Sequence, residues 1–259
     1  MRGCTSCTVD NALIPSAQSS VTNVYRARLP TNKDAIIRLT WSRDRAGPSL
    51  SVAINNKPII NPTDSTKGSC SCIFANSILG LCWDFSAAKY NLGPEPISDF
   101  YVVLIFDKKI ALLVGDKNFS KGAANSVADF SMVSRTVQVV GRTIYSTRAR
   151  FYDEGKEHEI TIRFQGELEL SMHVDEKKVL HVRRLRWNFR GNDTVFVDGL
   201  AVDVMWDLFG WLFQDPTGCA VVLMRTRATT KSRLWMLEEE WGERDEGVCE
   251  GFSLVIQVS

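Results

Sequence analysis

The sequence of 259 residues lacks an excess of charge of either sign and has no long hydrophobic run. Lysine and arginine number 31 and aspartate and glutamate 30, so the formal net charge is only +1. This balance gives no general attraction to nucleic acid or to an anionic membrane. The apolar run YVVLIF at residues 101–106 is far shorter than the roughly 20 residues that a membrane helix needs. We therefore expect neither a nucleic-acid partner nor a membrane span.

Histidine is also scarce, with only His158, His173 and His181 in the chain. No G-x-S-x-G, phosphate-binding loop, glycine-rich dinucleotide fingerprint or H-E-x-x-H sequence is present. General acid–base catalysis most often recruits histidine, so an enzyme here would have to use carboxylates. We therefore assign no catalytic residues, and such an enzyme is the third of our hypotheses.

Seven cysteines occur without the spacing of a disulfide framework, so we expect free thiols in a reducing compartment. Four of them could supply thiolates to a zinc ion: Cys4, Cys7, Cys70 and Cys72. No second C-x-x-C and no nearby histidine support that site, so we favour free thiols and predict no cofactor. The N-terminal stretch MRGCTSCTVDNALIPSAQSS has no apolar core of the kind that secretory signals contain, which indicates a cytoplasmic or nuclear protein.

What the chain does contain is a similarity between its two halves. YRARLPTNKDAIIRLTW at 25–41 aligns with YSTRARFYDEGKEHEITIRF at 145–164, and SLSVAINNKPII at 49–60 aligns with ELSMHVDEKKVL at 169–180. Trp83-Asp84 then falls on Trp206-Asp207. These blocks keep their order with little slippage, which predicts an internal duplication. We expect a flexible segment at 1–18, a first repeat at 19–117, a linker at 118–138, and a second repeat at 139–259 that ends in a helix and a strand.

Within each copy the apolar residues alternate with polar ones, as in half-buried strands. Ile37, Leu39 and Trp41 alternate in this way in the first copy. Asn55-Asn56, Asp175-Glu176 and residues 107–109 read as hairpin turns. We predict an all-β fold of antiparallel sandwich or barrel halves related by a pseudo-twofold. Short helices are expected only at 83–90, 206–213 and 232–243.

Several long blocks resemble one known family. They are SVTNVYRARLP, WDFSAAKYNLGPEPISDFYV, STRARFYDEGKEHEITIRF, LRWNFRGNDTVFVDGLAVDVMWDLFGWLF and GFSLVIQV. From about residue 17 to the C-terminus the chain is similar to the plant family of domain of unknown function 868. The resemblance implies a plant protein and brings no catalytic or ligand residues with it.

The Trp-Asp pairs are interpreted first as structure, because a Trp at the end of a strand is usually core and the Asp can cap the next turn. The copies differ directly after the pair, where the second is richer in aromatic residues. We therefore name as candidate binding residues Trp206, Phe209, Trp211 and Phe213, which could line a hydrophobic groove or pack between the halves.

A second candidate is the basic stretch HVRRLRWNFRGN at 181–192, read as a strand. In that strand Arg184, Arg186 and Arg190 would share one face. This face could meet phosphate or an acidic partner, or it could be a solvated face paired with Glu167 or Glu169.

The leading hypothesis is a non-catalytic β-rich scaffold that binds another protein through one copy or the seam between them. The alternative is a carrier that holds a small hydrophobic ligand in a β-barrel pocket lined by residues such as Trp206, Trp211 and Phe213.

Overall fold

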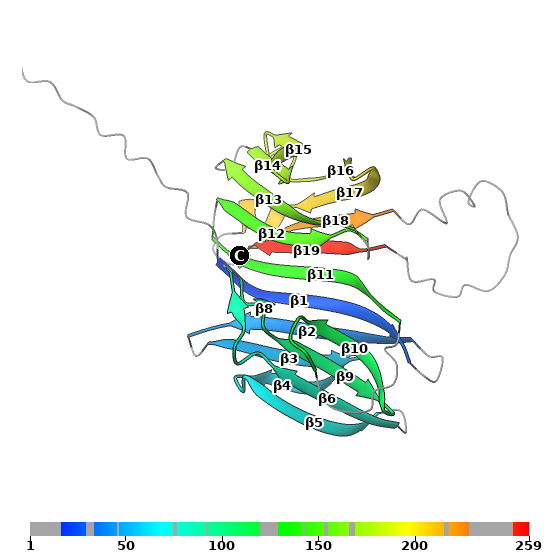
Figure 1. Ribbon diagram of the computed structural model, residues 1–259. Helices are drawn as coiled ribbons and strands as arrows, with labels where there is room; N and C mark the ends of the chain where they lie inside the picture. Colours follow the sequence, from blue (N-terminus) through cyan, green and yellow to red (C-terminus); the bar gives the residue numbers. More distant parts are fainter. Residues whose placement is uncertain are drawn as a thin grey trace, which may run out of the picture.

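The computed structural model describes residues 17–29, 34–45, 47–74, 77–91, 93–119, 129–141, 143–152, 155–165, 169–214, 218–227 and 251–258. This part of the chain is almost all β, which confirms the predicted class (Figure 1). The first unit holds β1 (Ala17–Arg28), β2 (Asp34–Arg43), β3 (Pro48–Ile54), β4 (Lys57–Thr63), β5 (Lys67–Phe74), β6 (Ser77–Asp84), β7 (Lys89–Tyr90), β8 (Pro96–Ser98), β9 (Tyr101–Phe106) and β10 (Lys109–Gly115). After β11 (Phe130–Val140), the second unit holds β12 (Ile144–Arg150), β13 (Glu157–Gln165), β14 (Glu169–Val174), β15 (Lys177–Arg183), β16 (Arg190–Val197), β17 (Leu200–Asp207), α1 (Phe209–Phe213), β18 (Ala220–Thr226) and β19 (Ser253–Val258).

The predicted turns join these strands as tight hairpins. Asn55 and Asn56 have φ of 46° and 64°, and Asp175 and Glu176 have 47° and 67°. Positive φ at both central residues is the two-residue turn whose twist matches that of the flanking strands. The prediction of hairpins at these turns is therefore confirmed.

The two units have the same strand order. In the first, β1-β2-β3-β4 form one layer and β10-β9-β6-β5 the other. In the second, the corresponding layers are β12-β13-β14-β15 and β19-β18-β17-β16. Buried residues from both layers form one core in each unit, so each is a β-sandwich rather than a barrel. Duplication of an ancestral unit remains a prediction about how this correspondence arose.

The strand β11 joins the sandwiches into one sheet. It pairs antiparallel with β1 and parallel with β19, giving a nine-stranded sheet in the order β16-β17-β18-β19-β11-β1-β2-β3-β4 (Figure 1). A twofold axis would place equivalent layers on its two sides. This sheet instead joins the β1 layer of one unit to the β19 layer of the other, so the predicted pseudo-twofold is wrong for the junction.

Part of the expected linker is a strand of the central sheet. Residues 130–138 of the expected linker belong to β11, which contributes the buried Val137 to the core of the second unit. Arg135 on the same strand pairs with Glu95 of the first unit, with 2.6 Å between Nη2 and Oε2. Its Nη1 donates to Asn23 Oδ1 on β1 at 2.9 Å. This contact holds the loop after β7 against the junction.

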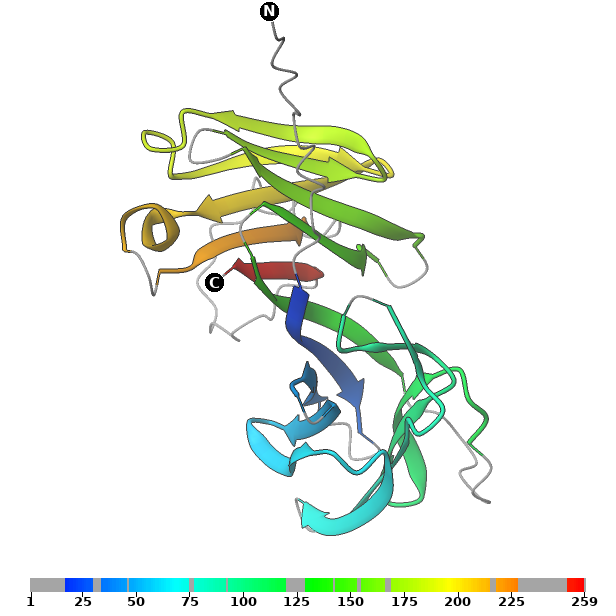
Figure 2. The same ribbon diagram turned by 90° about the vertical axis from the view of Figure 1, so that its left-hand side faces the viewer.

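Of the three predicted helices, one is wrong, one is present in part and one lies outside the described residues. Residues 83–90 form the end of β6, a turn and β7, so the expected helix there is wrong. At 206–213 the helix is confined to α1, which protrudes from the side of the second sandwich (Figure 2). The helix expected at 232–243 and the first 16 residues lie outside the described residues.

Candidate functional site

The Trp-Asp pairs perform the same structural task in both units. Trp83 donates from Nε1 to the carbonyl of Ser65 at 2.8 Å, and Trp206 donates to the carbonyl of Asn188 at 2.9 Å. Each Trp lies opposite a glycine of the neighbouring strand, Gly68 or Gly191. The indole occupies the space that a side chain would fill at that glycine. The pair is therefore a packing and capping unit.

The aspartates of these pairs cap the chain that follows. Asp84 Oδ1 accepts the backbone N–H of Ser86 at 3.1 Å, and Asp207 Oδ1 accepts that of Phe209 at 3.0 Å. Burial opposes ionisation of Asp84, but hydrogen bonds from Lys117, Ser86 and Lys67 hold the pKa of its carboxyl well below the usual range. This confirms the interpretation of the sequence.

After the second pair, three aromatic rings gather at the surface. Phe189, Phe209 and Phe213 lie with ring centroids 5.5–5.8 Å apart, each ring contacting the other two. Arg190 lies over Phe209, with Cζ 5.3 Å from the ring centroid, and its Nε pairs with Asp207 at 2.9 Å. We call Phe189, Phe209, Phe213 and Arg190 the aromatic patch.

Helix geometry explains which aromatic residues reach this patch. Phe209 and Phe213 are four residues apart and share one face of α1, whereas Trp211 faces the opposite way. Trp211 packs inward on Phe164, with ring centroids 4.7 Å apart. Of the four aromatic candidates, Phe209 and Phe213 therefore come together, while Trp206 and Trp211 are engaged in packing.

The predicted basic strand is not formed. β15 ends at Arg183, and the N–H groups of Trp187 and Asn188 both bond to the carbonyl of Arg184, whose φ is 54°. Residues 184–189 therefore form a turn, and Arg184, Arg186 and Arg190 do not share the face of a strand. Arg190 begins β16 and pairs with Asp207 instead of Glu167 or Glu169.

His158 is a buried residue in the second unit. Its Nδ1 lies 2.9 Å from Asp175 Oδ2, and its Nε2 lies 2.9 Å from Asp198 Oδ2. The two aspartates belong to the tips of the β14–β15 and β16–β17 hairpins, one in each layer. Hydrogen bonds from the backbone of Glu159, from His158 and from Lys156 lower the pKa of Asp175 to about 2. His158 thus links the two layers.

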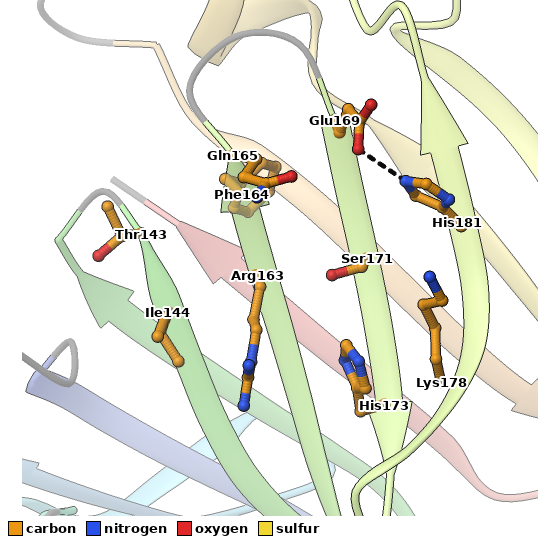
Figure 3. Close-up of a pocket in the computed structure, with 10 residues that line it drawn as sticks. All are labelled: Thr143, Ile144, Arg163, Phe164, Gln165, Glu169, Ser171, His173, Lys178 and His181. Carbon is orange, nitrogen blue, oxygen red and sulfur yellow. Dashed lines mark hydrogen bonds and ion pairs between the residues drawn. The ribbon is translucent and has the colours of Figure 1, made fainter. Parts of the chain in front are cut away.

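The outer face of β12–β15 carries a polar pocket that the sequence did not reveal (Figure 3). It encloses about 400 Å³. Most of its polar lining comes from three neighbouring strands: Arg163, Gln165, Glu169, Ser171, His173, Lys178 and His181. Ser171, a small residue on the central strand β14, pairs with Arg163 on one side and with His181 on the other. We call this the basic pocket.

Among the described residues, some polar groups of the basic pocket have a partner and others have none. Glu169 Oε2 lies 2.8 Å from His181 Nε2, and this hydrogen bond lowers the pKa of Glu169. Arg163 and Lys178 form no ion pair with a carboxylate in the described part of the chain. His173 Nδ1 is buried without a hydrogen-bond partner there. Burial and the charges of Arg163 and Lys178 lower the pKa of His173.

No group of three or more His, Cys, Asp or Glu residues suited to a metal ion occurs among the described residues. Cys70 and Cys72 are free thiols on β5. Cys4 and Cys7 lie outside the described residues, so the four-thiolate zinc site stays a hypothesis. No helix in the described ranges has the length and hydrophobicity to cross a membrane.

Fold and surface together define an all-β protein of two joined sandwiches, with an exposed aromatic patch and a basic pocket on the second. Residues 16–258 match the family model described as plant protein of unknown function (DUF868), and the chain belongs to this family. No curated protein and no solved structure matches the chain.

Proposed function

We propose that this protein is a non-catalytic scaffold that binds another protein through the aromatic patch of its second unit. The observation that carries the proposal is the exposure of Phe209 and Phe213, which are 38% and 46% exposed. Exposed aromatic rings lose water-accessible apolar area when a partner covers them, and aromatic residues are enriched among the energetic centres of protein interfaces. Trp211 anchors α1 to the core, so the two rings are presented on a fixed element.

The fold of a unit does not require these rings. In the first unit Ser86 occupies the place of Phe209, since each donates its N–H to the aspartate of the Trp-Asp pair. Thr66 occupies the place of Phe189, since the carbonyls of both accept the N–H that follows that aspartate. A sandwich of the same strand order thus forms with two small polar residues here. The aromatic rings are accordingly available for a role outside the fold.

The charges around the patch point to the chemistry of the partner. Arg190 stacks on the rings, and two exposed arginines lie nearby in the chain: Arg183 at the end of β15 and Arg184 in the turn that follows. Trp187 in the same turn is 84% exposed. We infer that the partner presents a segment with an apolar anchor flanked by acidic side chains, which would place carboxylates near the arginines.

No observation favours a carrier of a hydrophobic ligand. Such a carrier would need an internal cavity lined by Trp206, Trp211 and Phe213. In the structure Trp206 covers Gly191, Trp211 packs on Phe164, and Phe213 lies at the surface.

The experiment is selection of a random peptide display library against the full chain. The Phe209→Ser variant, which introduces the residue of the first unit, is used for counter-selection. We expect enriched peptides that combine an apolar or aromatic residue with Asp or Glu. Enrichment of peptides that bind the variant equally well, or of basic peptides, would contradict the proposal.

The matched control is Phe196→Ser. Phe196 lies on β16, the strand that begins with Arg190, and is 71% exposed, but it has no ring contact with the aromatic patch in the described residues. The enriched peptides should bind this variant as they bind the unchanged protein. Equal loss in both variants would mean that general surface hydrophobicity is responsible.

A further inference from the structure

The basic pocket is a second feature of the second unit, separate from the aromatic patch. It lies on the outer face of the β12–β15 layer, whereas the aromatic patch lies where β16 and β17 meet α1. The two therefore belong to different layers of the sandwich, and the pocket needs its own explanation.

Two cations flank the floor of this pocket. Arg163 stands on β13 and Lys178 on β15, with β14 between them, and Figure 3 shows them on either side of His173. Two strand spacings separate β13 from β15, which is about 10 Å. Neither cation has a carboxylate partner in the described part of the chain. An anion seated over β14 would therefore be within reach of both side chains.

The floor between the cations offers donors in addition to charge. Ser171 is the small residue in the centre of the pocket, and its hydroxyl can donate or accept. His173 has a buried Nδ1 without a partner among the described residues. Among the described residues that line the pocket, Glu169 is the one carboxylate, and it is already bonded to His181. The free groups are thus mostly cationic or neutral donors, which suits an acceptor-rich ligand.

The first unit shows that these residues are not needed to build the layer. The pair Arg163–Ser171 corresponds to Thr40–Ser51 in the first unit. The pair His173–Lys178 corresponds to Ala53–Pro58. The corresponding layer therefore forms with neutral side chains at these four positions. A strand face that concentrates cations without partners, on a scaffold that folds without them, indicates selection for binding.

We propose that the basic pocket binds the phosphate group of a small phosphate monoester. Phosphate supplies the charge and the acceptor oxygens that Arg163, Lys178 and Ser171 can satisfy together. A pocket of about 400 Å³ is in the range of small-molecule sites, so the phosphate belongs to a larger molecule. Ile144 gives the pocket an apolar side chain on its β12 side, where the body of the ester would lie.

The test uses inorganic phosphate and phenyl phosphate as probes, with binding to the full chain measured by calorimetry at constant ionic strength. Arg163→Thr and Lys178→Gln should each weaken binding of phenyl phosphate at least about tenfold, since each removes a charge-assisted bond. Arg148→Thr is the matched control, because it removes the same charge from the outer face of the same layer and should change the affinity less than about twofold. An equal loss in Arg148→Thr, or no binding by the unchanged protein, would overturn the proposal.

Two further readouts sharpen the test. Phenyl phosphate should bind more tightly than inorganic phosphate, and equal affinities would overturn the assignment to a monoester. The titration of His173, followed by NMR with and without phenyl phosphate, should move to higher pH in the complex. The bound anion offsets the repulsion that Arg163 and Lys178 exert on the imidazolium. A titration of His173 that does not move would place the anion elsewhere.

Discussion

Gly68 faces Trp83 across β5 and β6 so closely that a Cβ at residue 68 would lie 2.4 Å from Cζ2 of the indole. In the second unit Gly191 faces Trp206 in the same way, and the corresponding distance is 2.3 Å. Each glycine is therefore required by the close approach of a ring, and the two tryptophans differ in burial, since Trp83 is buried and Trp206 only partly buried.

Gly68→Ala should lower the free energy of unfolding by about 1–3 kcal/mol, the usual cost of an added methyl group in a packed site. Trp83 is buried, with 7% exposure, so it has little room to shift. Gly191→Ala should cost less, because Trp206 is only partly buried. Urea denaturation of the two variants measures the difference. A larger loss for Gly191→Ala would contradict this account of the Trp-Asp unit.

The buried carboxylate of Asp84 should make stability depend on acid pH. Its folded pKa lies below the unfolded value of 3.8, so the ionised form contributes fully above about pH 4. The contribution is lost as the pH falls below that value toward the folded pKa. Asp84→Asn should therefore be less stable than the unchanged protein at pH 7, and the gap should narrow at pH 3. Denaturant curves at both pH values measure the gap, and a gap of constant size would show that Asp84 acts only through its shape.

His158→Ala introduces the residue that the first unit has at this place, Ala35. We expect the free energy of unfolding to fall by about 1–3 kcal/mol, because removal of the buried imidazole leaves Asp175 and Asp198 without their shared partner. Calorimetric unfolding measures the loss. Ala35→Gly in the first unit serves as the control for a general weakening of a sandwich. A His158→Ala protein as stable as the unchanged one would mean that the link between the hairpin tips is energetically neutral.

The strands and hairpins were predictable from the pattern of neighbouring residues. The hairpins at Asn55-Asn56 and Asp175-Glu176 follow from the alternation of the strands and from turn residues, and most of these residues tolerate positive φ. The basic strand at 181–192 was predicted wrongly because Leu185, Trp187 and Phe189 alternate as in a strand. In the structure these residues form a turn. Arg184 begins the turn with a positive φ, and Leu185 is buried.

Long-range pairing was not predictable in the same way. The pseudo-twofold failed because β11 joins inequivalent layers, and nothing in the local pattern of residues 130–140 specifies β1 and β19 as its partners. The basic pocket was missed because Arg163, His173 and Lys178 come from three strands and meet only through the sheet register. The aromatic patch was partly predicted, since Phe209 and Phe213 are only four residues apart in sequence, whereas Phe189 joins them from another strand connection.

The central claim is that the second unit presents the partner-binding surface on a scaffold that does not need that surface to fold. The most direct measurement is the affinity of a selected acidic–apolar peptide for the unchanged protein and for a Phe209→Ser/Phe213→Ser double variant. Their unfolding free energies are measured in parallel. We expect the affinity to fall at least about tenfold while stability changes by less than about 1 kcal/mol. An unchanged affinity, or a loss of affinity that accompanies unfolding of the second unit, would contradict the claim.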